Sequence, residues 1–517
     1  MTSRRTSWLT ACALGALLAA TPALAADNHG GELTVAITGE TIDTFDPLFG
    51  SRPTTEGAYM NLFYDTLVRL NRDGTYSPAL AESFEVDPET GSMRFSLRDG
   101  ITFHDGTPFD AEAAAYNLRR AADPEAGGRW VDALSPISEI TVVGPMDLEV
   151  TLENPSPFVL FTLASSAGMM VSPTFIENEG AEALGRQAVG TGPFVFDDIQ
   201  DGVGVDASRN PDYWETDADG DPLPYLDAVT VRFIPQSSVA LLELRAGGVA
   251  AIQDVSPNDF AVVDNEDGIH LIDTGKGAAS HINFNHSQPP FDDVLIRRAV
   301  QHAIDREATC EAVLGAYCAV VPGLLGTAEW AYTDNLDVPG YDPEQSCALL
   351  AEAGVETPFP VDLMIIRREP DTQIAEILQA QLNMACFDAT IAVQERTTVV
   401  DAMVNLQHQF ALGQYSTSLD PHGTIGAAYG TGGSRNRSGI SYEDTDALIA
   451  DAVATVDRDA RFDMYEEIQQ QAIDRVYFGS LFWRPRPSAA SNQIGNVETL
   501  PLAADGNWRI GNWWLAD

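Results

Sequence analysis

The sequence contains few combinations of side chains whose spacing supports catalysis. It has no H-E-x-x-H, C-x-x-C or G-x-S-x-G motif, the arrangements used by zinc proteases, thiol oxidoreductases and serine hydrolases. The one lysine of the chain, Lys276, does not follow the glycines of a G-x-x-x-x-G-K-[ST] phosphate-binding loop. We therefore expect a protein that is not an enzyme and that uses no cofactor.

Two sets of side chains have types that suit a metal, but their spacing does not. His281 and His286 flank an alternating polar and apolar run, which predicts a strand, and residues five apart on a strand face opposite sides. The acidic run 217–221 begins like a calcium loop, yet Pro222 stands where such a loop needs glycine and the bidentate glutamate is missing. We expect a tight acidic turn there and no metal site in the chain.

Four cysteines remain after an expected leader that contains Cys12, and an even number in an exported protein indicates disulfides. Three pairings of Cys310, Cys318, Cys347 and Cys386 are possible. We favour Cys310–Cys318, because it closes a short loop, and Cys347–Cys386, which would tie the start of a helix to the entry of a strand.

The elements that position these residues alternate between strands and helices, which predicts an α/β protein with mixed sheets. Residues 57–70 are typical of a helix that runs into a strand, residues 95–98 alternate like an edge strand, and Asp110 suits the N-cap of a helix. Further strands are expected at 32–38, 148–152, 361–366, 390–393 and 410–415, and helices at 111–122, 237–247, 292–305, 372–384, 398–405, 444–456 and 459–475.

The first residues have the pattern of a secretory signal peptide. Arg4 and Arg5 precede an apolar stretch over 8–20, and Ala23-Leu24-Ala25 forms an A-x-A cleavage site. We expect residues 1–25 to be removed after Ala25, and no cysteine follows that would anchor a lipid. The protein is therefore expected to be periplasmic.

Charge sets limits on the partners of this chain. Its 517 residues contain 29 Lys and Arg against 76 Asp and Glu, a formal net charge of −47. Such a chain is repelled by phosphate backbones, so we expect no nucleic-acid partner. The acidic residues are spread along the whole chain, which is typical of a salt-adapted surface, and the alternative is an acidic face that binds a cationic ligand.

Several long motifs occur in an order that belongs to one protein family. They include PALAESF at 78–84, FSLRDGITFHDGTPF at 95–109, GTGPF at 190–194 and RNPDYW at 209–214. These stretches resemble the signature of the family 5 extracellular solute-binding proteins, which are the peptide/nickel-type periplasmic receptors of ATP-binding-cassette importers. The resemblance extends over essentially the whole mature chain.

This resemblance implies a two-lobed clamp of the type II periplasmic-binding-protein class, with an extra subdomain in lobe one. Lobe one is expected at 26–50, 186–279 and 481–517, its extra subdomain at 51–185 and lobe two at 280–480, with crossings at 275–283 and 477–484. A ligand that bridges two lobes favours the closed state, which a permease and its ATPase then recognise. A monomer is expected.

The resemblance also suggests where a ligand would bind. Peptide-binding members place an aspartate four residues before an Asp-Pro or Glu-Pro pair to hold the ligand's amino terminus, and this position is Thr417 here. Asp420 is a candidate replacement, although it also suits a turn. Peptides are the first expectation, and a non-peptide ligand such as an oligosaccharide, an opine-like amine or a chelated metal is the alternative.

Arginines are the candidates for holding a carboxylate, because the guanidinium group offers two parallel donors. Arg367 and Arg368 lie at a predicted strand end, where solvent-facing pairing with nearby acids is the alternative role. Arg435 and Arg437 flank Asn436 in a glycine-rich loop. The aromatic residues Tyr415, Tyr429 and Trp483 are candidates for the wall of the cleft, or for the core.

Overall fold

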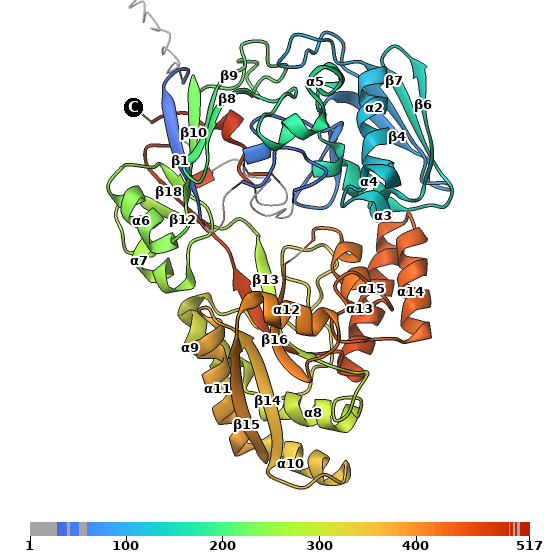
Figure 1. The fold of residues 1–517 in the computed structure, drawn as a ribbon, viewed down its shortest axis with the longest axis vertical. Coiled ribbons are helices and arrows are strands. Elements are labelled where there is room, and N and C mark those ends of the chain that lie inside the picture. Colours follow the sequence, from blue (N-terminus) through green and yellow to red (C-terminus); the bar gives the residue numbers. More distant parts are fainter. Residues whose placement is uncertain are drawn as a thin grey trace, which may run out of the picture.

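The computed structural model describes residues 28–38, 42–50, 59–416, 418–495, 497–499, 502–503 and 507–516. The predicted signal peptide and Thr417 lie outside these residues. The chain forms two lobes that are stacked along its longest axis (Figure 1). Among the described residues, no helix combines the length and the apolar character that crossing a membrane requires.

Lobe one contains a seven-stranded sheet in which β1 (Glu32–Thr38) is central. This strand pairs in parallel with β10 (Ala228–Ile234) and β11 (Ala251–Ile252), and its apolar residues are buried on both faces, as expected for parallel strands. The other strands are β8 (Phe194–Gln200), β9 (Gly204–Arg209), β12 (Ile269–Ile272) and β18 (Ser488–Ser491). Helices α6 (Ser237–Arg245) and α7 (Phe260–Asp264) pack against the sheet through a shared apolar cluster.

A second sheet belongs to the same lobe and has the strand order β4-β5-β7-β6. Residues 95–98 were expected at an edge, but β5 is an inner strand, because it pairs with β4 on one side and β7 on the other. Phe95 of this strand is fully buried. Asp110 caps α2 (Ala111–Ala122) as predicted, accepting a 2.9 Å hydrogen bond from the Ala113 amide. The strands are β4 (Ala81–Val86), β5 (Met93–Leu97), β6 (Ile137–Gly144) and β7 (Asp147–Leu152), and the further helices are α3 (Val131–Leu134), α4 (Pro157–Leu163) and α5 (Pro173–Glu179). A small hairpin, β2 (Val68–Leu70) and β3 (Tyr76–Pro78), precedes this sheet.

Lobe two is built on a five-stranded mixed sheet with the order β15-β14-β16-β13-β17. Its strands are β13 (Gly277–Phe284), β14 (Phe359–Ile366), β15 (Phe387–Gln394), β16 (Phe410–Ser416) and β17 (Phe478–Pro485). Its helices are α8 (Val294–Ala303), α9 (Arg306–Leu314), α10 (Pro343–Glu352), α11 (Asp371–Met384), α12 (Arg396–Val404), α13 (Ile425–Tyr429), α14 (Glu443–Ala454) and α15 (Arg458–Asp474). The predicted strands and helices of lobe two are confirmed, with ends shifted by a few residues. In lobe one, the helix expected within 57–70 is not confirmed, because of its described residues only 59–60 are helical and 61–67 form turns and irregular backbone before β2.

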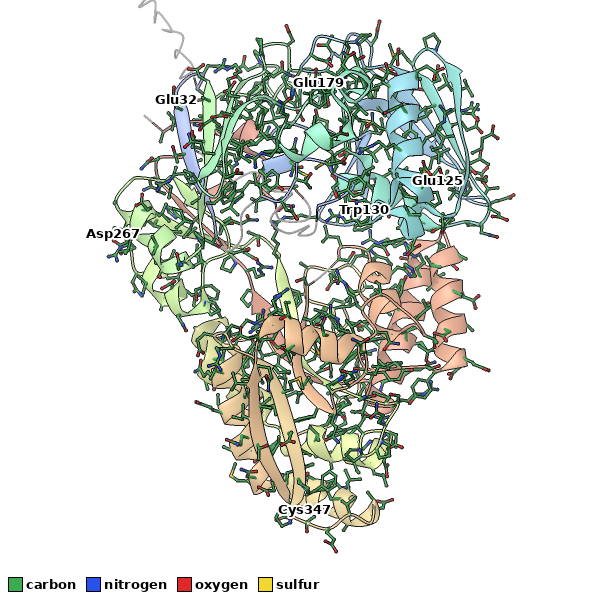
Figure 2. The ribbon with its side chains drawn as sticks, viewed as in Figure 1. Glu32, Glu125, Trp130, Glu179, Asp267 and Cys347 are labelled. Atoms are coloured by element: carbon green, nitrogen blue, oxygen red, sulfur yellow. A yellow bond between two sulfur atoms is a disulfide. The ribbon has the colours of Figure 1, made fainter. Side chains whose placement is uncertain are left out.

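Both favoured disulfides are confirmed. Cys310 bonds to Cys318 across a separation of 8 residues, and Cys347 bonds to Cys386 across 39 residues. The second bond joins α10 to the segment that enters β15, as the sequence suggested. It lies at the end of lobe two that is remote from lobe one, where Cys347 is labelled (Figure 2).

The chain crosses between the lobes twice, and the two crossing segments are bonded to each other. The Thr274 hydroxyl donates to the Arg486 carbonyl at 2.9 Å, and the Arg486 amide donates to the Lys276 carbonyl at 2.9 Å. All of β13 and β17 lies in the sheet of lobe two, whereas the predicted limits of 280 and 480 divide these strands. These paired segments connect the two lobes.

Candidate ligand-binding site

A cavity of about 1310 Å³ lies between the lobes and is lined by both of them. From lobe one, residues near α3 and α4, the β2 strand and the C-terminal segment line it. From lobe two, the lining comes from the segment 418–435 and from the end of α14. A solute in this cavity would therefore contact both lobes at once.

The lobes contact each other on both sides of this cavity. Phe158 at α4 meets His422 edge to face, with ring centroids 4.9 Å apart. On the α7 side, Tyr317 of lobe two packs edge to face on Phe260, also at 4.9 Å. The view in Figure 1 shows these two places as separate, with α4 above α14 on one side and α7 above α9 on the other. The structure is thus a closed arrangement of the lobes.

Lobe one supplies a buried network of charges to the cavity wall. Glu215 accepts hydrogen bonds from Arg69 at 2.8 Å and from Arg509 at 3.2 Å. Asp65 accepts from the Trp214 indole at 3.0 Å and from the Tyr213 hydroxyl at 3.2 Å. Burial raises the pKa of Asp65, whereas the two guanidinium groups beside Glu215 outweigh its burial and lower its pKa. Both carboxylates are therefore held by the protein itself.

Aromatic side chains near α3 and α4 form an apolar part of the wall. Phe158 and Phe161 stack with centroids 5.4 Å apart, and both line the cavity. The Arg129 guanidinium lies 4.8 Å from the Trp130 ring centroid and donates to the Ser166 hydroxyl at 3.0 Å. Figure 2 shows Trp130 on the side of lobe one that faces lobe two. The wall thus combines rings, which bury apolar surface, with charged groups that can orient a polar ligand.

Of the predicted loop residues, Arg435 is the one that lines the cavity. It donates to the Ser416 carbonyl at 3.0 Å, and its own carbonyl accepts a hydrogen bond from the Tyr415 hydroxyl. Asn436 shapes the loop, because its amide donates to the carbonyls of Gly430 at 2.9 Å and Ile440 at 2.7 Å. Tyr415 and Asn436 therefore hold this loop in place and do not line the cavity themselves.

Asp420 forms a buried ion pair rather than a free carboxylate. It accepts two hydrogen bonds from Arg461, at 3.0 and 3.1 Å, and both side chains are almost fully buried. It also accepts from the His422 amide at 2.9 Å. Its charge is thus already balanced, and a role in holding a ligand's amine stays a prediction.

The other predicted residues lie outside the cavity lining. Arg367 is 69% exposed and lies 3.6 Å from Glu395, while Arg368 bonds to Asp371 at 2.7 Å. Trp483 is buried, and its ring packs against Gly277 of β13. A Cβ atom at position 277 would lie 2.3 Å from this ring, so only glycine fits at that position. Tyr429 is buried in the same cluster, and the Nε of Arg437 is also buried.

The two sets of side chains whose types suit a metal make contacts within the protein instead. His281 is fully buried, stacks on Tyr415 with centroids 4.4 Å apart, and burial lowers its pKa to about 4. The predicted acidic turn is confirmed, since one carboxylate oxygen of Asp217 accepts the amides of Asp219 at 2.9 Å and Asp221 at 2.8 Å. Within the described ranges, no group of three His, Cys, Asp or Glu side chains could hold a metal ion.

Comparison with known sequences decides the family. Residues 75–436 match the family described as bacterial extracellular solute-binding proteins, family 5 Middle. The chain belongs to this family. This match confirms the resemblance seen in the sequence motifs. The relatives of this solute-binding protein are solute-binding proteins as well.

Individual relatives agree with this assignment. The solute-binding protein is 28% identical to the glutathione-binding protein GsiB of Salmonella paratyphi A over 396 residues, which cover 76% of this chain and 74% of GsiB. Among solved structures, it is similar to DppA from Helicobacter pylori in complex with the peptide STSA, with a TM-score of 0.79, 22% identity and coverage of 95% and 99% of the two chains. NikA from Brucella suis in complex with Fe(III)-EDTA gives a TM-score of 0.82 at 21% identity, with coverage of 94% and 100%. These likenesses confirm the two-lobed type II fold.

Sequence reasoning missed most of the residues that line the cavity of this solute-binding protein. Arg69, Glu215 and Arg509 are far apart in the chain and meet only in the fold. Lys276 could have been selected from the sequence, because it is the one lysine of the chain and lies within the predicted crossing 275–283. It lines the cavity and its ammonium group bonds to Asn507.

Proposed function

We propose that this protein captures a short peptide between its lobes and delivers it to the membrane permease of an ATP-binding-cassette importer. The observation that supports this most is the cavity of about 1310 Å³, lined by both lobes. Typical small-molecule sites enclose about 300–1,000 Å³, so this one has room for several amino-acid residues. GsiB is named for binding glutathione, a tripeptide, and DppA was solved with the peptide STSA.

Capture proceeds through closure of the lobes about the paired hinge segments. A ligand that contacts both lobes binds the closed state more tightly and shifts the equilibrium towards it by that difference in affinity. The permease recognises the closed form, and separate ATPase subunits supply the energy. No bond is made or broken by this component, which acts as a periplasmic monomer after removal of residues 1–25.

Ligand contacts are assigned to side chains in each lobe. Arg435 of lobe two and Arg129 of lobe one face the same cavity and would each hold a carboxylate of a peptide, while the Trp130 ring would cover apolar surface. Thr417, between Ser416 and the cavity-lining Ser418, is the position at which the family resemblance implies an aspartate in peptide-binding members.

A non-peptide ligand is the second candidate function. The observation that favours it is Thr417, because a hydroxyl cannot balance the buried ammonium group of a peptide's amino terminus. NikA, which shares the fold, was solved with a chelated metal, Fe(III)-EDTA. An opine-like amine or an oligosaccharide belongs to the same alternative.

Isothermal titration of the mature protein with glutathione and with the tripeptide Ala-Ala-Ala tests the first candidate. We expect saturable binding of at least one of them, with protection against thermal unfolding that rises with concentration. Absence of binding by these and by longer peptides would contradict peptide capture. Thr417→Asp separates the candidates further, since a peptide-shaped cleft predicts tighter binding of free-amino Ala-Ala-Ala and no gain for its N-acetylated form.

A further inference from the structure

The cavity lining reverses the charge balance of the chain. The whole chain has 76 acidic and 29 basic side chains. Among the described residues that line the cavity, the basic ones outnumber the acidic ones by seven to four. The basic residues are Arg69, Arg72, Arg129, Lys276, Arg435, Arg486 and Arg509, and the acidic ones are Asp65, Asp132, Glu153 and Glu215.

The four acidic residues of the lining have little unbalanced charge with which to hold a ligand. Glu215 is bonded to Arg69 and Arg509, and Asp65 accepts hydrogen bonds from its own neighbours, so these buried carboxylates are balanced within lobe one. Asp132 and Glu153 are exposed, where water screens their charges. The same contacts balance Arg69 and Arg509, and Arg486 pairs with Asp254 at 2.6 Å. The positive excess at the cavity therefore comes from the remaining basic residues, among them Arg435 and the exposed Arg72.

This excess comes from both lobes. Arg435 contributes from lobe two and Arg72 from lobe one, and neither forms an ion pair with a described residue; they donate to the carbonyls of Ser416 at 3.0 Å and Asp273 at 3.4 Å. Glu329, the buried acid near Arg435, does not neutralise it, because burial raises the pKa of Glu329 to about 8. Closure thus brings cationic groups on opposite walls towards one volume.

We propose that the ligand is a multiply charged anion, with at least two carboxylate groups or equivalent anionic groups and a net negative charge. The inference rests on the proposed function only in assuming that this cavity is the binding site. An anion that fills the cavity would balance the cationic walls as they come together, whereas a neutral ligand would leave the half-buried Arg435 without a counter-charge. The composition left open the alternative of an acidic face that binds a cationic ligand. The lining of this cavity is not such a face.

Titration calorimetry at pH 7 and constant ionic strength, with length-matched peptides, tests the inference. The probes are Glu-Ala-Glu, Ala-Ala-Ala and Lys-Ala-Lys, together with citrate as a non-peptide anion. We expect Glu-Ala-Glu to bind at least about tenfold more tightly than Ala-Ala-Ala, the effect of about one charge-assisted hydrogen bond, and Lys-Ala-Lys to bind most weakly.

Each outcome separates the two proposals. Equal or tighter binding of Ala-Ala-Ala or Lys-Ala-Lys would overturn the anionic inference and leave peptide capture standing. Binding of citrate without binding of any peptide would overturn peptide capture and support the anionic inference. Failure of all four probes would overturn both.

Variants locate the effect in the cavity. Arg435→Gln should weaken Glu-Ala-Glu by about tenfold or more and Ala-Ala-Ala by less, and Arg435→Lys should restore part of the difference. Arg72→Gln gives a second test at an exposed position if Arg435→Gln does not fold. The matched control is Arg94→Gln, which removes an exposed arginine of β5 that pairs with Glu149 at 3.1 Å. Equal losses for both peptides, or an equal loss in the control, would overturn the inference.

Discussion

The Tyr317 hydroxyl of lobe two donates a hydrogen bond to the Asp264 carboxylate of lobe one. Tyr317 also packs on Phe260 of lobe one, and it directly precedes Cys318 in the loop that the Cys310–Cys318 bond closes. The disulfide thus anchors the residue that bridges the lobes. This bridge stabilises the closed arrangement without touching the ligand, because none of these residues lines the cavity.

Replacing Tyr317 with Phe should weaken ligand binding by up to about tenfold, since one hydrogen bond contributes about 0.5–1.5 kcal/mol. The expected loss comes from a less stable closed state and should be similar for every ligand. Small-angle scattering with saturating ligand should show a larger open fraction. Tyr341→Phe, at an exposed position, is the control, and an affinity of Tyr317→Phe equal to that of the control would contradict the role of the bridge.

Asp420→Asn should lower the free energy of unfolding by about 3–5 kcal/mol, because it leaves the buried guanidinium of Arg461 uncompensated. Urea denaturation measures this change. In the double variant Asp420→Asn/Arg461→Met, the unpaired charge is gone and much of the loss should be recovered. If Asp420→Asn keeps full stability and loses only affinity for free-amino peptides, Asp420 is a ligand anchor and the structural role is wrong.

Glu329 should make stability fall as pH rises. Burial raises its pKa from 4.5 to about 8, so the folded protein binds a proton that the unfolded chain has released. Its contribution is therefore fully present below about pH 4.5, declines above it and is lost as the pH passes through about 8. Urea unfolding at pH 6 and pH 9 should show a smaller decline in Glu329→Gln than in the original protein, and identical declines would contradict the assignment.

Arg367→Gln should leave ligand affinity unchanged, because Arg367 is exposed beside Glu395 and lies outside the cavity lining. Surface ion pairs of this kind contribute about 0–1 kcal/mol, so stability should change little as well. Titration calorimetry of Arg367→Gln and Arg435→Gln in parallel compares two of the arginines that the sequence suggested for holding a carboxylate. A tenfold or larger loss in Arg367→Gln would restore the role that the sequence suggested for it.

Local sequence patterns predicted the fold well where the signal is contained in neighbouring residues. The Asp110 cap, the β1 strand and both disulfides all depend on short-range chemistry or on apolar periodicity, and all are present. The position of β5 could not be predicted in the same way. Whether an alternating strand lies inside a sheet depends on which strands flank it, and that is set by the tertiary fold.

The candidate site was harder to predict, because it is assembled from distant segments. Arg435 was found from its glycine-rich loop, but the burial of Asp420 depends on Arg461, which lies 41 residues further along the chain. Arg69 and Arg509 converge on Glu215 only when lobe one is complete. A list of arginines in sequence order does not show which of them face the same cavity.

We propose that the closed cavity holds a short, negatively charged peptide. Mass spectrometry can identify the small molecules that are released when protein purified from its native periplasm is denatured. We expect one or more peptides of a few residues in which carboxylates outnumber amines. A neutral or cationic molecule in stoichiometric amount would contradict the charge assignment, and one defined non-peptide mass would contradict peptide capture.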